Sequence, residues 1–563
     1  MALMSLSMLN GERAVVLLVL IRILSSTSFS LLFIESLALC LLAFAAFFVE
    51  ISVENSINST TKFTARPGAS SGILLGAVTL PALVFSKLIQ LSRGFLLAEV
   101  ALEEFQYQKF LYWTTYISCF SVLLFLRLVI QHPSSSRFVV KCGFTFVMLG
   151  ALVYLILPLD SSNDGMSGLL VALVFLWMFG HGIAAVKLIQ HILCTFPSCA
   201  SIGEALLMTC GLTTYFGDML RSTLVKIVQC LTSLEVHMRY SIKRSEISTI
   251  IQGYLLGLLL FPLLFKFIVQ IVGRFSSSSS YNAKIWNESG RSVVFFTLLA
   301  VSSAAIIPLW LQFVQDFQEH PLWWVLKFVF SEPYKRLSLC IYWVGVICVS
   351  VHRFYNISKS SKVERILLRK YYHLMAVSMF VPALILQPNF LNLAFGAALA
   401  AFLVLEIIRV WRIWPLGEMI HHFMNAFTDH RDSDLLIVSH FSLLLGCALP
   451  IWISSGFNDR PLAPFAGILS LGIGDTMASM VGYKYGVLRW SKTGKKTIEG
   501  TAAGITSVMA ACSFLLPLLA STGYIQNWTS LLLAVIASGL LEAYTAQLDN
   551  AFIPLVFYSL LCL

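Results

Sequence analysis

Apolar runs long enough to cross a lipid bilayer recur from one end of this sequence to the other. Of its 563 residues, 58% are hydrophobic and only 12% are charged, and the mean hydropathy is +0.83. Soluble domains carry about 25% charged residues, so the composition excludes a soluble globular protein. A run of about 20 apolar residues spans a bilayer as a helix, whereas a membrane barrel would show short alternating segments. We therefore predict an all-α, polytopic integral membrane protein with roughly 14–17 transmembrane helices.

We divide the chain into a multi-span membrane region, residues 1–357, and a second membrane region, residues 358–563, which carries more polar detail for each helix. For the first region we expect a lipid-binding or scaffold role. Its predicted spans are Ala14–Leu24, Leu31–Val53, Gly72–Leu91, Phe110–Ile130, Phe138–Leu157, Leu169–Ile192, Ile250–Val272, Val293–Val314 and Leu337–Val351. The predicted spans of the second region are Leu374–Leu386, a run ending at Arg409, Leu435–Ile453, Leu462–Gly482, Thr501–Ala520 and Leu531–Gln547.

The distribution of basic residues predicts the orientation of the second region. The connectors Ser358–Tyr371, Arg409–Asp434 and Tyr483–Gly500 hold thirteen Lys and Arg residues, whereas the alternate connectors hold only Arg460. Basic loops stay in the cytoplasm, so we expect these three connectors to face the cytosol. Basic loops of this kind also account for the formal net charge of +10, and we expect no nucleic-acid partner.

One stretch, Leu471–Thr501, concentrates charge between two predicted spans. It reads LGIGDTMASMVGYKYGVLRWSKTGKKTIEGT. Its connecting loop carries five cations: Lys484, Arg489, Lys492, Lys495 and Lys496. Lysines there can bind phosphate oxygens, and Thr497 can add a hydroxyl contact. If the next helix begins near Thr497, its N-terminal amides form a further anion site. The stretch therefore predicts a polyphosphate site at the membrane surface.

Carboxylates accompany these cations. Gly472, Asp475, Ser479 and Gly482 fall on one small, polar helical stripe, which another helix or a ligand can approach closely. A carboxylate at membrane depth is costly and therefore usually functional. Near the chain end, Glu542 and Asp549 are two helical turns apart. Two or three carboxylates beside a polyphosphate suit a divalent cation such as Mg²⁺, so we predict Asp475, Glu542 and Asp549 as metal ligands.

Structural alternatives to these site predictions stay open at this point. The lysines at 495 and 496 would also serve as topology determinants that bind lipid headgroups. Asp549 would also suit a plain helix end, and Arg369, Lys370 and His373 would also suit a basic flank of a span. Within Ser201–Arg244, Glu204 fits either an interfacial amphipathic helix or the wall of a substrate groove.

The second region resembles the dolichol kinases of the polyprenol kinase family. The matching segments are RKYYHL at 369–374, the IWPLG, DHRDSD and SH motifs within 413–440, LPIWI at 449–453, LGIGDTMASMVGYKYG, GKKTIEGT and the C-terminal LEAYTAQLDNAFIPL. The resemblance covers residues 358–563 in order, and GEA at 203–205 fits more loosely. The segment from Trp490 to Lys495 is one residue longer than the family pattern, which leaves the register before the lysines open.

The resemblance implies a CTP-dependent kinase of the endoplasmic reticulum membrane that phosphorylates the terminal hydroxyl of dolichol. The product, dolichyl phosphate, is the lipid sugar carrier for protein N-glycosylation. On this analogy residues 483–499 bind CTP on the cytosolic side, and dolichol enters from the bilayer with membrane lipids as neighbours. Self-association into a homo-oligomer stays open.

The resemblance and the residue chemistry together give a set of site predictions. The predicted catalytic residues are Asp475, Lys495, Lys496 and Asp549. The predicted nucleotide-binding residues are Arg369, Lys370, His373, Gly474, Tyr483, Lys484, Tyr485, Gly486, Arg489, Trp490, Lys495, Lys496, Thr497, Glu499 and Gly500.

Three alternatives to this activity differ in substrate or in the reaction they carry out. A phytol or other polyprenol kinase would use the same residues on another isoprenoid alcohol. A phosphatidate cytidylyltransferase also resembles the KKTIEGT segment, but it would transfer CMP, and the chain ends in LDNAFIPL rather than in that family's His-Gly-Gly and paired-Asp signature. A transporter would place polar residues near mid-bilayer, whereas here they collect at one interface.

Overall fold

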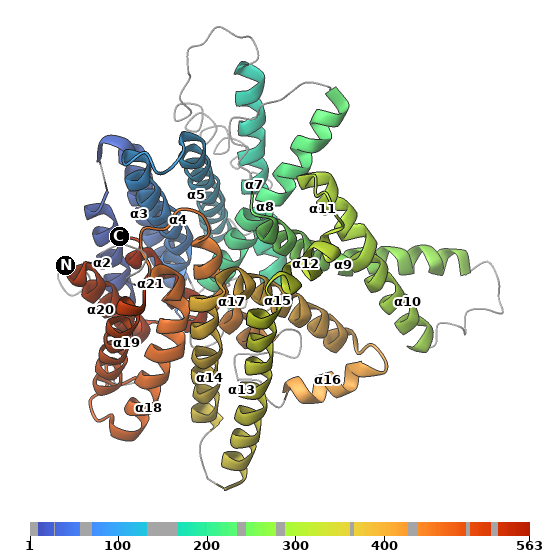
Figure 1. Ribbon diagram of the computed structural model, residues 1–563. Coiled ribbons are helices and arrows are strands. Elements are labelled where there is room, and N and C mark those ends of the chain that lie inside the picture. Colours follow the sequence, from blue (N-terminus) through green and yellow to red (C-terminus); the bar gives the residue numbers. More distant parts are fainter. Residues whose placement is uncertain are drawn as a thin grey trace.

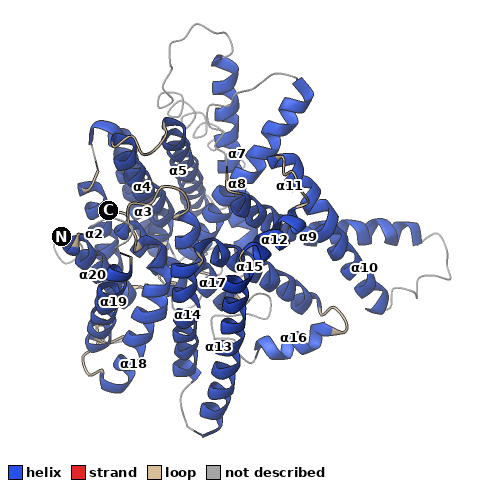
Figure 2. Ribbon diagram, viewed as in Figure 1, coloured by secondary structure: helices blue, strands red, loops and turns tan. Residues whose placement is uncertain are grey.

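The protein is a bundle of helices in a computed structural model (Figure 1). The structure describes residues 10–27, 29–56, 70–131, 167–196, 199–232, 244–276, 288–360, 365–425, 437–490, 496–519 and 527–563. Within these ranges every named element is a helix and none is a strand (Figure 2). The all-α fold predicted from the apolar runs is therefore confirmed.

Most helices of the first region coincide with predicted spans. The helices of this region are α2 (Gly11–Ser25), α3 (Phe29–Ser56), α4 (Ile73–Leu96), α5 (Leu102–Gln131), α7 (Ser167–Thr195), α8 (Ile202–Thr232), α9 (Glu246–Ser276), α10 (Glu288–Val301), the π-helix η1 (Ser302–Ile306), α11 (Ile307–Gln315), α12 (Pro321–Ser331) and α13 (Pro333–Ser360). Of these, α8 and α12 were not predicted as spans. The predicted span Phe138–Leu157 lies outside the described residues.

The second region continues the bundle. Its helices are α14 (Arg365–Leu386), α15 (Pro388–Trp411), α16 (Leu416–Asn425), α17 (Val438–Ile453), the 3₁₀ turn η2 (Ala463–Phe465), the π-helix η3 (Ile468–Asp475), α18 (Thr476–Tyr485), α19 (Ile498–Leu518), α20 (Trp528–Tyr544) and α21 (Asp549–Leu561). The single predicted span Leu462–Gly482 is thus a 3₁₀ turn, a π-helix and an α-helix in succession.

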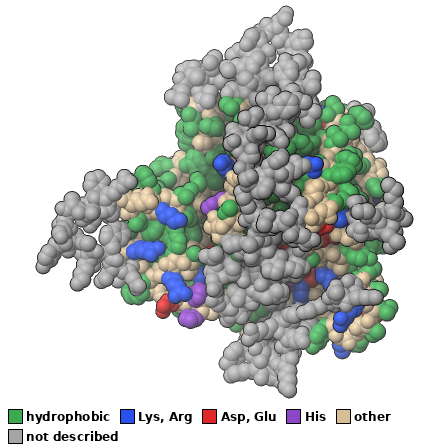
Figure 3. All heavy atoms as spheres, turned by 180° about the vertical axis from the view of Figure 1, so that it is seen from behind, with side chains coloured by type: hydrophobic (Ala, Val, Ile, Leu, Met, Phe, Trp, Pro, Cys, Tyr) green, Lys and Arg blue, Asp and Glu red, His purple; other side chains and the backbone are tan. Residues whose placement is uncertain are grey.

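Many of the described helices are apolar enough to cross a membrane. Nine of them meet the length and hydropathy needed for a span, and five shorter helices are also apolar. Hydrophobic side chains occupy large parts of the described surface in Figure 3, with charged side chains in small groups. Exposed leucines and phenylalanines are expected where lipid, not water, surrounds the protein. The predicted polytopic membrane class is confirmed, and the predicted total of spans stays a prediction.

Helix α4 is the centre of the bundle. In the most apolar 18-residue stretch of α4, 94% of the residues are buried. The corresponding value for α13, at the periphery, is 11%. Helix α4 packs against α3, α5 and α8 of the first region and against α21, at the end of the chain. One hydrophobic core includes Leu88 and Phe85 of α4 together with Phe552 and Tyr558 of α21. The two regions therefore share a core, and their division into 1–357 and 358–563 stays a prediction.

Polar side chains tie one end of α4 to the end of the chain. Arg93 donates from Nε and Nη2 to the two carboxylate oxygens of Asp459, at 2.8 and 2.9 Å. Its Nη2 also donates to the carbonyl of Cys562 at 2.7 Å, and Gln90 Nε2 donates to Asp459 Oδ1 at 2.9 Å. Burial alone would raise the pKa of Asp459, but the bonds from Arg93 outweigh it and hold that pKa below its usual value.

We expect Asp459→Asn to lower the free energy of unfolding by about 1–3 kcal/mol, because hydrogen bonds to charged groups contribute about that much. The bonds stabilise the ionised carboxylate, so their contribution is complete above the ordinary Asp pKa of about 3.9 and is lost as pH falls through the lowered pKa. Thermal unfolding in detergent at several pH values tests this. The difference between parent and variant should be largest near neutral pH and shrink below about pH 4; a difference that grows on acidification contradicts it.

Candidate active site

A buried ion-pair cluster joins α14 to the end of the π-helix η3. The ammonium group of Lys370 on α14 donates to Oδ2 of Asp475. His373, one turn further along α14, places Nδ1 at 3.3 Å from the same oxygen. Asp475 is 3% exposed and His373 is 5% exposed. We call these three residues the Lys370–His373–Asp475 cluster. A buried carboxylate without partners would be very costly, so the ammonium of Lys370 and the imidazole of His373 account for its presence in the bundle.

Two further contacts orient this cluster. Ser479, one turn after Asp475 on α18, donates from Oγ to Asp475 Oδ1 at 3.4 Å. His373 Nδ1 also lies 3.2 Å from the backbone carbonyl of Leu471. Since both neighbours of Nδ1 are oxygen acceptors, this nitrogen carries the proton. Both oxygens of Asp475 therefore have protein donors, and the carboxylate is held in one orientation.

The other two predicted metal ligands approach the same cluster. Glu542 is on the last turn of α20, and Asp549 is the first residue of α21. The prediction that they lie two turns apart on one helix was wrong, because a non-helical turn separates α20 from α21. The charges of Asp475, Asp549 and Glu542 all act on the ammonium of Lys370. Asp475 contacts Lys370 directly, and the other two predicted carboxylates lie near enough for their charges to act on it.

No three His, Cys, Asp or Glu side chains within the described ranges form a group that could hold a metal by themselves. Mg²⁺ differs from a structural metal because it is usually bound through one or two carboxylates, with water and substrate phosphates as the other ligands. Glu542 and Asp549 as ligands of a Mg²⁺ ion that arrives with a polyphosphate stay a prediction.

The predicted nucleotide loop is closed at its base by backbone hydrogen bonds. Thr497 caps α19, its Oγ1 accepting from the amide of Gly500, so the predicted helix start is confirmed. Arg489 and Thr497 form an antiparallel bridge. The amide of Trp490 donates to the carbonyl of Lys496 at 3.2 Å, and the amide of Ile498 donates to the carbonyl of Leu488 at 2.8 Å. The tip, residues 491–495 with the predicted Lys495, lies outside the described residues.

Lys496 connects this loop to the carboxylates. Its ammonium group donates to the backbone carbonyl of Glu542 and lies 3.5 Å from that of Thr545. These carbonyls belong to the C-terminal end of α20, where a cation is favourable. The charge of Lys496 also acts on the Glu542 carboxylate. Lys496 therefore lies beside the acidic group, and its phosphate-binding role stays a prediction.

Other predicted loop residues have structural contacts. The carboxylate of Glu499 accepts from the amide of Leu488 at 2.9 Å, and the indole of Trp490 donates to Thr501 Oγ1 at 2.9 Å. Tyr483, Lys484, Tyr485 and Arg489 are on the exposed face, with Lys484 Nζ 5.0 Å from the ring centre of Tyr485. Arg369 begins the RKYYHL motif on α14, but its side chain is outside the described part of the structure.

The predicted glycines allow close helix packing. A Cβ atom at Gly500 would lie 2.5 Å from the carbonyl oxygen of Ala478, and one at Gly474 would lie 3.1 Å from Val508 of α19. At Gly486 a Cβ atom would lie 2.3 Å from the carbonyl oxygen of Gly482. In this structure the close neighbour that these small residues admit is another part of the chain, chiefly α19 against η3 and α18. A ligand contact at these glycines stays a prediction.

The first region holds the turn that carries Asp549. Glu204, near the start of α8, is 5% exposed and accepts from the amide of Leu548 through Oε1 at 2.7 Å. Its Oε2 accepts from the amide of Ser201 at 2.8 Å, and Ser201 Oγ accepts from the amide of Glu204 at 3.1 Å. Gln547 in the same turn donates to the carbonyl of Ser70 at 3.0 Å. The start of α21 is therefore fixed by residues more than 300 positions earlier.

From the sequence, Glu204 fitted either an amphipathic helix or the wall of a substrate groove. Its contact with the turn before Asp549 was not predicted. One local signal was available, because Ser201-x-x-Glu204 has the spacing of a capping box. That motif predicts a helix start at this position. It does not predict that the second carboxylate oxygen binds the amide of Leu548, since that contact depends on the tertiary fold.

The fold and the site define a polytopic membrane protein whose buried cations and carboxylates meet at helix ends, an arrangement suited to a charged substrate at the membrane surface. A family model described as Dolichol kinase matches residues 183–448. Over 568 aligned residues the chain is 60% identical to Dolichol kinase EVAN of Arabidopsis thaliana, covering 99% of both chains. It is 28% identical to the dolichol kinase of Homo sapiens over 79% of this chain and 77% of the human one.

The chain is also 35% identical to dolichol kinase sec59 of Schizosaccharomyces pombe, over 42% of this chain and 49% of the yeast one. No solved structure matches it. The chain belongs to the dolichol kinase family, and the predicted family and enzyme class are confirmed.

Proposed function

We propose that this protein transfers the γ-phosphoryl group of CTP to the terminal hydroxyl of dolichol, giving dolichyl phosphate and CDP. Membership of the dolichol kinase family supports the lipid substrate. The observation that carries the proposal is the Lys370–His373–Asp475 cluster, in which Lys370 and His373 hold one carboxylate and whose charges act on Glu542 together with those of Lys496 and Asp549. The basic connectors support a site that faces the cytosol in the endoplasmic reticulum membrane.

In the proposed mechanism Lys370 and Lys496, with Lys495, bind the CTP phosphates. Lys370 exchanges its contact with Asp475 for one with the γ-phosphate. A divalent cation, when bound, would be held by Glu542 and Asp549 and would neutralise phosphate charge. Asp475 as a third metal ligand stays a prediction, since both of its oxygens have protein donors in this structure. Phosphoryl transfer depends mainly on positioning and charge neutralisation, which these residues supply.

The hydroxyl oxygen of dolichol attacks the γ-phosphorus, and the bond from that phosphorus to the β–γ bridging oxygen breaks. The electron pair of the broken bond leaves with CDP. Asp475, freed from Lys370, accepts the hydroxyl proton, while His373 and Ser479 keep its carboxylate oriented. This role requires the hydroxyl to lie within hydrogen-bond reach of Asp475.

An assay with two labelled forms of CTP tests the reaction class. Membranes containing the protein are incubated with dolichol and CTP labelled either at the γ-phosphate or at the α-phosphate. We expect the γ-label in the lipid and the α-label in released CDP. Transfer of the α-label into a lipid identifies a cytidylyltransferase instead. Transfer from ATP but not from CTP contradicts the proposed donor, and phosphorylation of phytol in place of dolichol contradicts the proposed acceptor.

Glu204 should act as a positioning residue for Asp549. We expect Glu204→Ala to lower kcat about a hundredfold with little change in the KM for CTP, because small misplacements of a catalytic group cost about that much. Glu204→Gln keeps an oxygen acceptor for the amide of Leu548 and should lose less than about tenfold. The measurement is steady-state kinetics on variants matched for unfolding temperature. Equal losses in both variants, or no loss in Glu204→Ala, contradict this role.

A further inference from the structure

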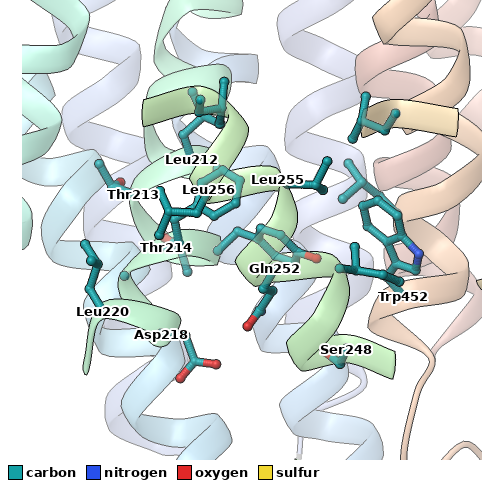
Figure 4. A pocket seen from close by; sticks show the side chains of 18 of the residues that line it. Leu212, Thr213, Thr214, Asp218, Leu220, Ser248, Gln252, Leu255, Leu256 and Trp452 are labelled. Carbon is teal, nitrogen blue, oxygen red and sulfur yellow. The ribbon is translucent and has the colours of Figure 1, made fainter. Parts of the chain in front are cut away.

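A large cavity lies between the two regions of the bundle. Its volume is about 2940 Å³, and its walls come mainly from α4, α5, α7, α8, α9, α15, α17 and α21. Apolar side chains make up most of its lining. Figure 4 shows Leu255 and Leu256 together with the polar side chains of Gln252 and Asp218, and Trp452 across from them. Pockets for drug-sized ligands measure about 300–1,000 Å³. This cavity is therefore several times larger than a nucleotide needs.

One end of the cavity lies at the start of α21, next to the turn that carries Asp549. Glu204, Leu548 and Ala551 all line it. Leu548 immediately precedes Asp549, and its amide is bound by Glu204. A molecule that fills this end of the cavity therefore contacts Leu548, the residue before Asp549.

The cavity also reaches the outer surface of the bundle along α7, α8 and α9. Several leucines that line it are exposed as well, including Leu176 at 64%, Leu260 at 47% and Leu263 at 65%. In a membrane protein such side chains face lipid. The wall that these leucines form is therefore a side through which an apolar molecule can enter from the bilayer.

The cavity is long as well as wide. Its lining residues follow α8 from Glu204 to Gln229, a path of about 37 Å at 1.5 Å per residue. This compares with about 30 Å for the hydrocarbon core of a bilayer. Two ion pairs on its wall, Arg244 with Asp218 at 2.5 Å and Lys226 with Asp316, cancel part of its charge. Apolar side chains make up most of the remaining lining, which favours a long hydrocarbon over a polyanion.

We infer that this cavity holds the isoprenoid chain of the alcohol substrate, with the hydroxyl end at Leu548 and Ala551 and the chain leaving toward the bilayer past α7 and α9. The inference rests on the proposed function, because that function supplies the occupant. It also assigns a role to the first region, whose helices α4, α5, α7, α8 and α9 build most of the wall.

Two helical glycines allow the cavity to be narrowed without displacing its walls. Gly180 on α7 and Gly211 on α8 both line it. A Cβ atom at Gly180 would meet no described atom within 4 Å, and one at Gly211 would meet only Leu80, at 3.6 Å. Phe is also a better helix former than Gly, so Gly180→Phe, Gly211→Phe and their combination should fold. Gly345→Phe is the matched control, because Gly345 is also helical and open but does not line the cavity.

The test measures binding of radiolabelled dolichol to purified protein in vesicles with excess phosphatidylcholine, CTP binding, and phosphoryl transfer. We expect the double variant to lose dolichol affinity by about tenfold or more, because a filled cavity resists a bulky occupant. CTP affinity should not change, and Gly345→Phe should resemble the parent.

Failure of this inference is distinguishable from failure of the proposed function. If the double variant binds and phosphorylates dolichol as the parent does, the cavity assignment is overturned and the kinase activity stands. If the parent binds dolichol, the double variant does not, and neither transfers phosphate, the cavity assignment stands and the proposed function fails. Equal occupancy of the parent by phosphatidylcholine and dolichol overturns the assignment, since the cavity then holds bulk lipid.

Discussion

Replacing Asp475 with Asn should lower the rate of dolichol phosphorylation by about 10²–10⁴-fold, the range that a general base contributes. Asn has nearly the same shape, but it cannot accept the hydroxyl proton. The measurement is kcat at saturating CTP and dolichol. Asp475 is buried beside Lys370 and His373, so the variant also leaves these two side chains without their carboxylate partner. Breaking a buried pair costs about 3–5 kcal/mol, and unfolding temperature must therefore be recorded with each rate.

The matched control for this variant is Asp459→Asn. Like Asp475, Asp459 pairs with a basic residue, in its case Arg93. The pair lies near the C-terminal ends of α4 and α21, whereas the carboxylate of Asp549 is at the N-terminal end of α21. This control should lose stability and keep kcat. Undiminished turnover in folded Asp475→Asn removes Asp475 from the mechanism, and an equal loss in both variants assigns the effect to stability.

Lys370→Met should produce the second largest loss, about a hundredfold or more in kcat/KM for CTP, because a phosphate-binding cation is lost from a site where little water screens it. Lys370→Arg should restore only part of the activity, since the guanidinium group does not replace a compact ammonium donor. Lys335→Met is the control, because Lys335 is 70% exposed and pairs with Glu332 at the surface. A normal KM for CTP in folded Lys370→Met contradicts the phosphate-binding role.

Local patterns in the sequence predict most of the helices, because a span is determined by the length of its own apolar run. The predicted spans Leu31–Val53 and Gly72–Leu91 differ from α3 and α4 by only a few residues at each end. The start of α19 at Thr497 follows from the capping preference of threonine. Each of these features depends on residues within one or two helical turns.

The features that could not be predicted depend on contacts between distant residues. Lys370 and Asp475 are 105 positions apart, so the sequence cannot show that they pair. The π-helix at 468–475 is likewise invisible in an apolar pattern, although it carries Asp475 toward α14. Gly500 was predicted to contact a nucleotide. In the structure its close neighbour is the backbone carbonyl of Ala478. The nearest neighbour of a small residue is a property of the packed bundle.

The most direct test of the account is a structure of the protein with dolichol, Mg²⁺ and a CTP analogue whose γ-phosphate cannot be transferred. We expect the triphosphate to contact Lys370 and Lys496, with its γ-phosphorus facing the dolichol hydroxyl beside Asp475. The isoprenoid chain should fill the cavity past Leu548. A nucleotide bound elsewhere, with Lys370 still paired to Asp475, would contradict the central claim that this cluster is the phosphoryl-transfer centre.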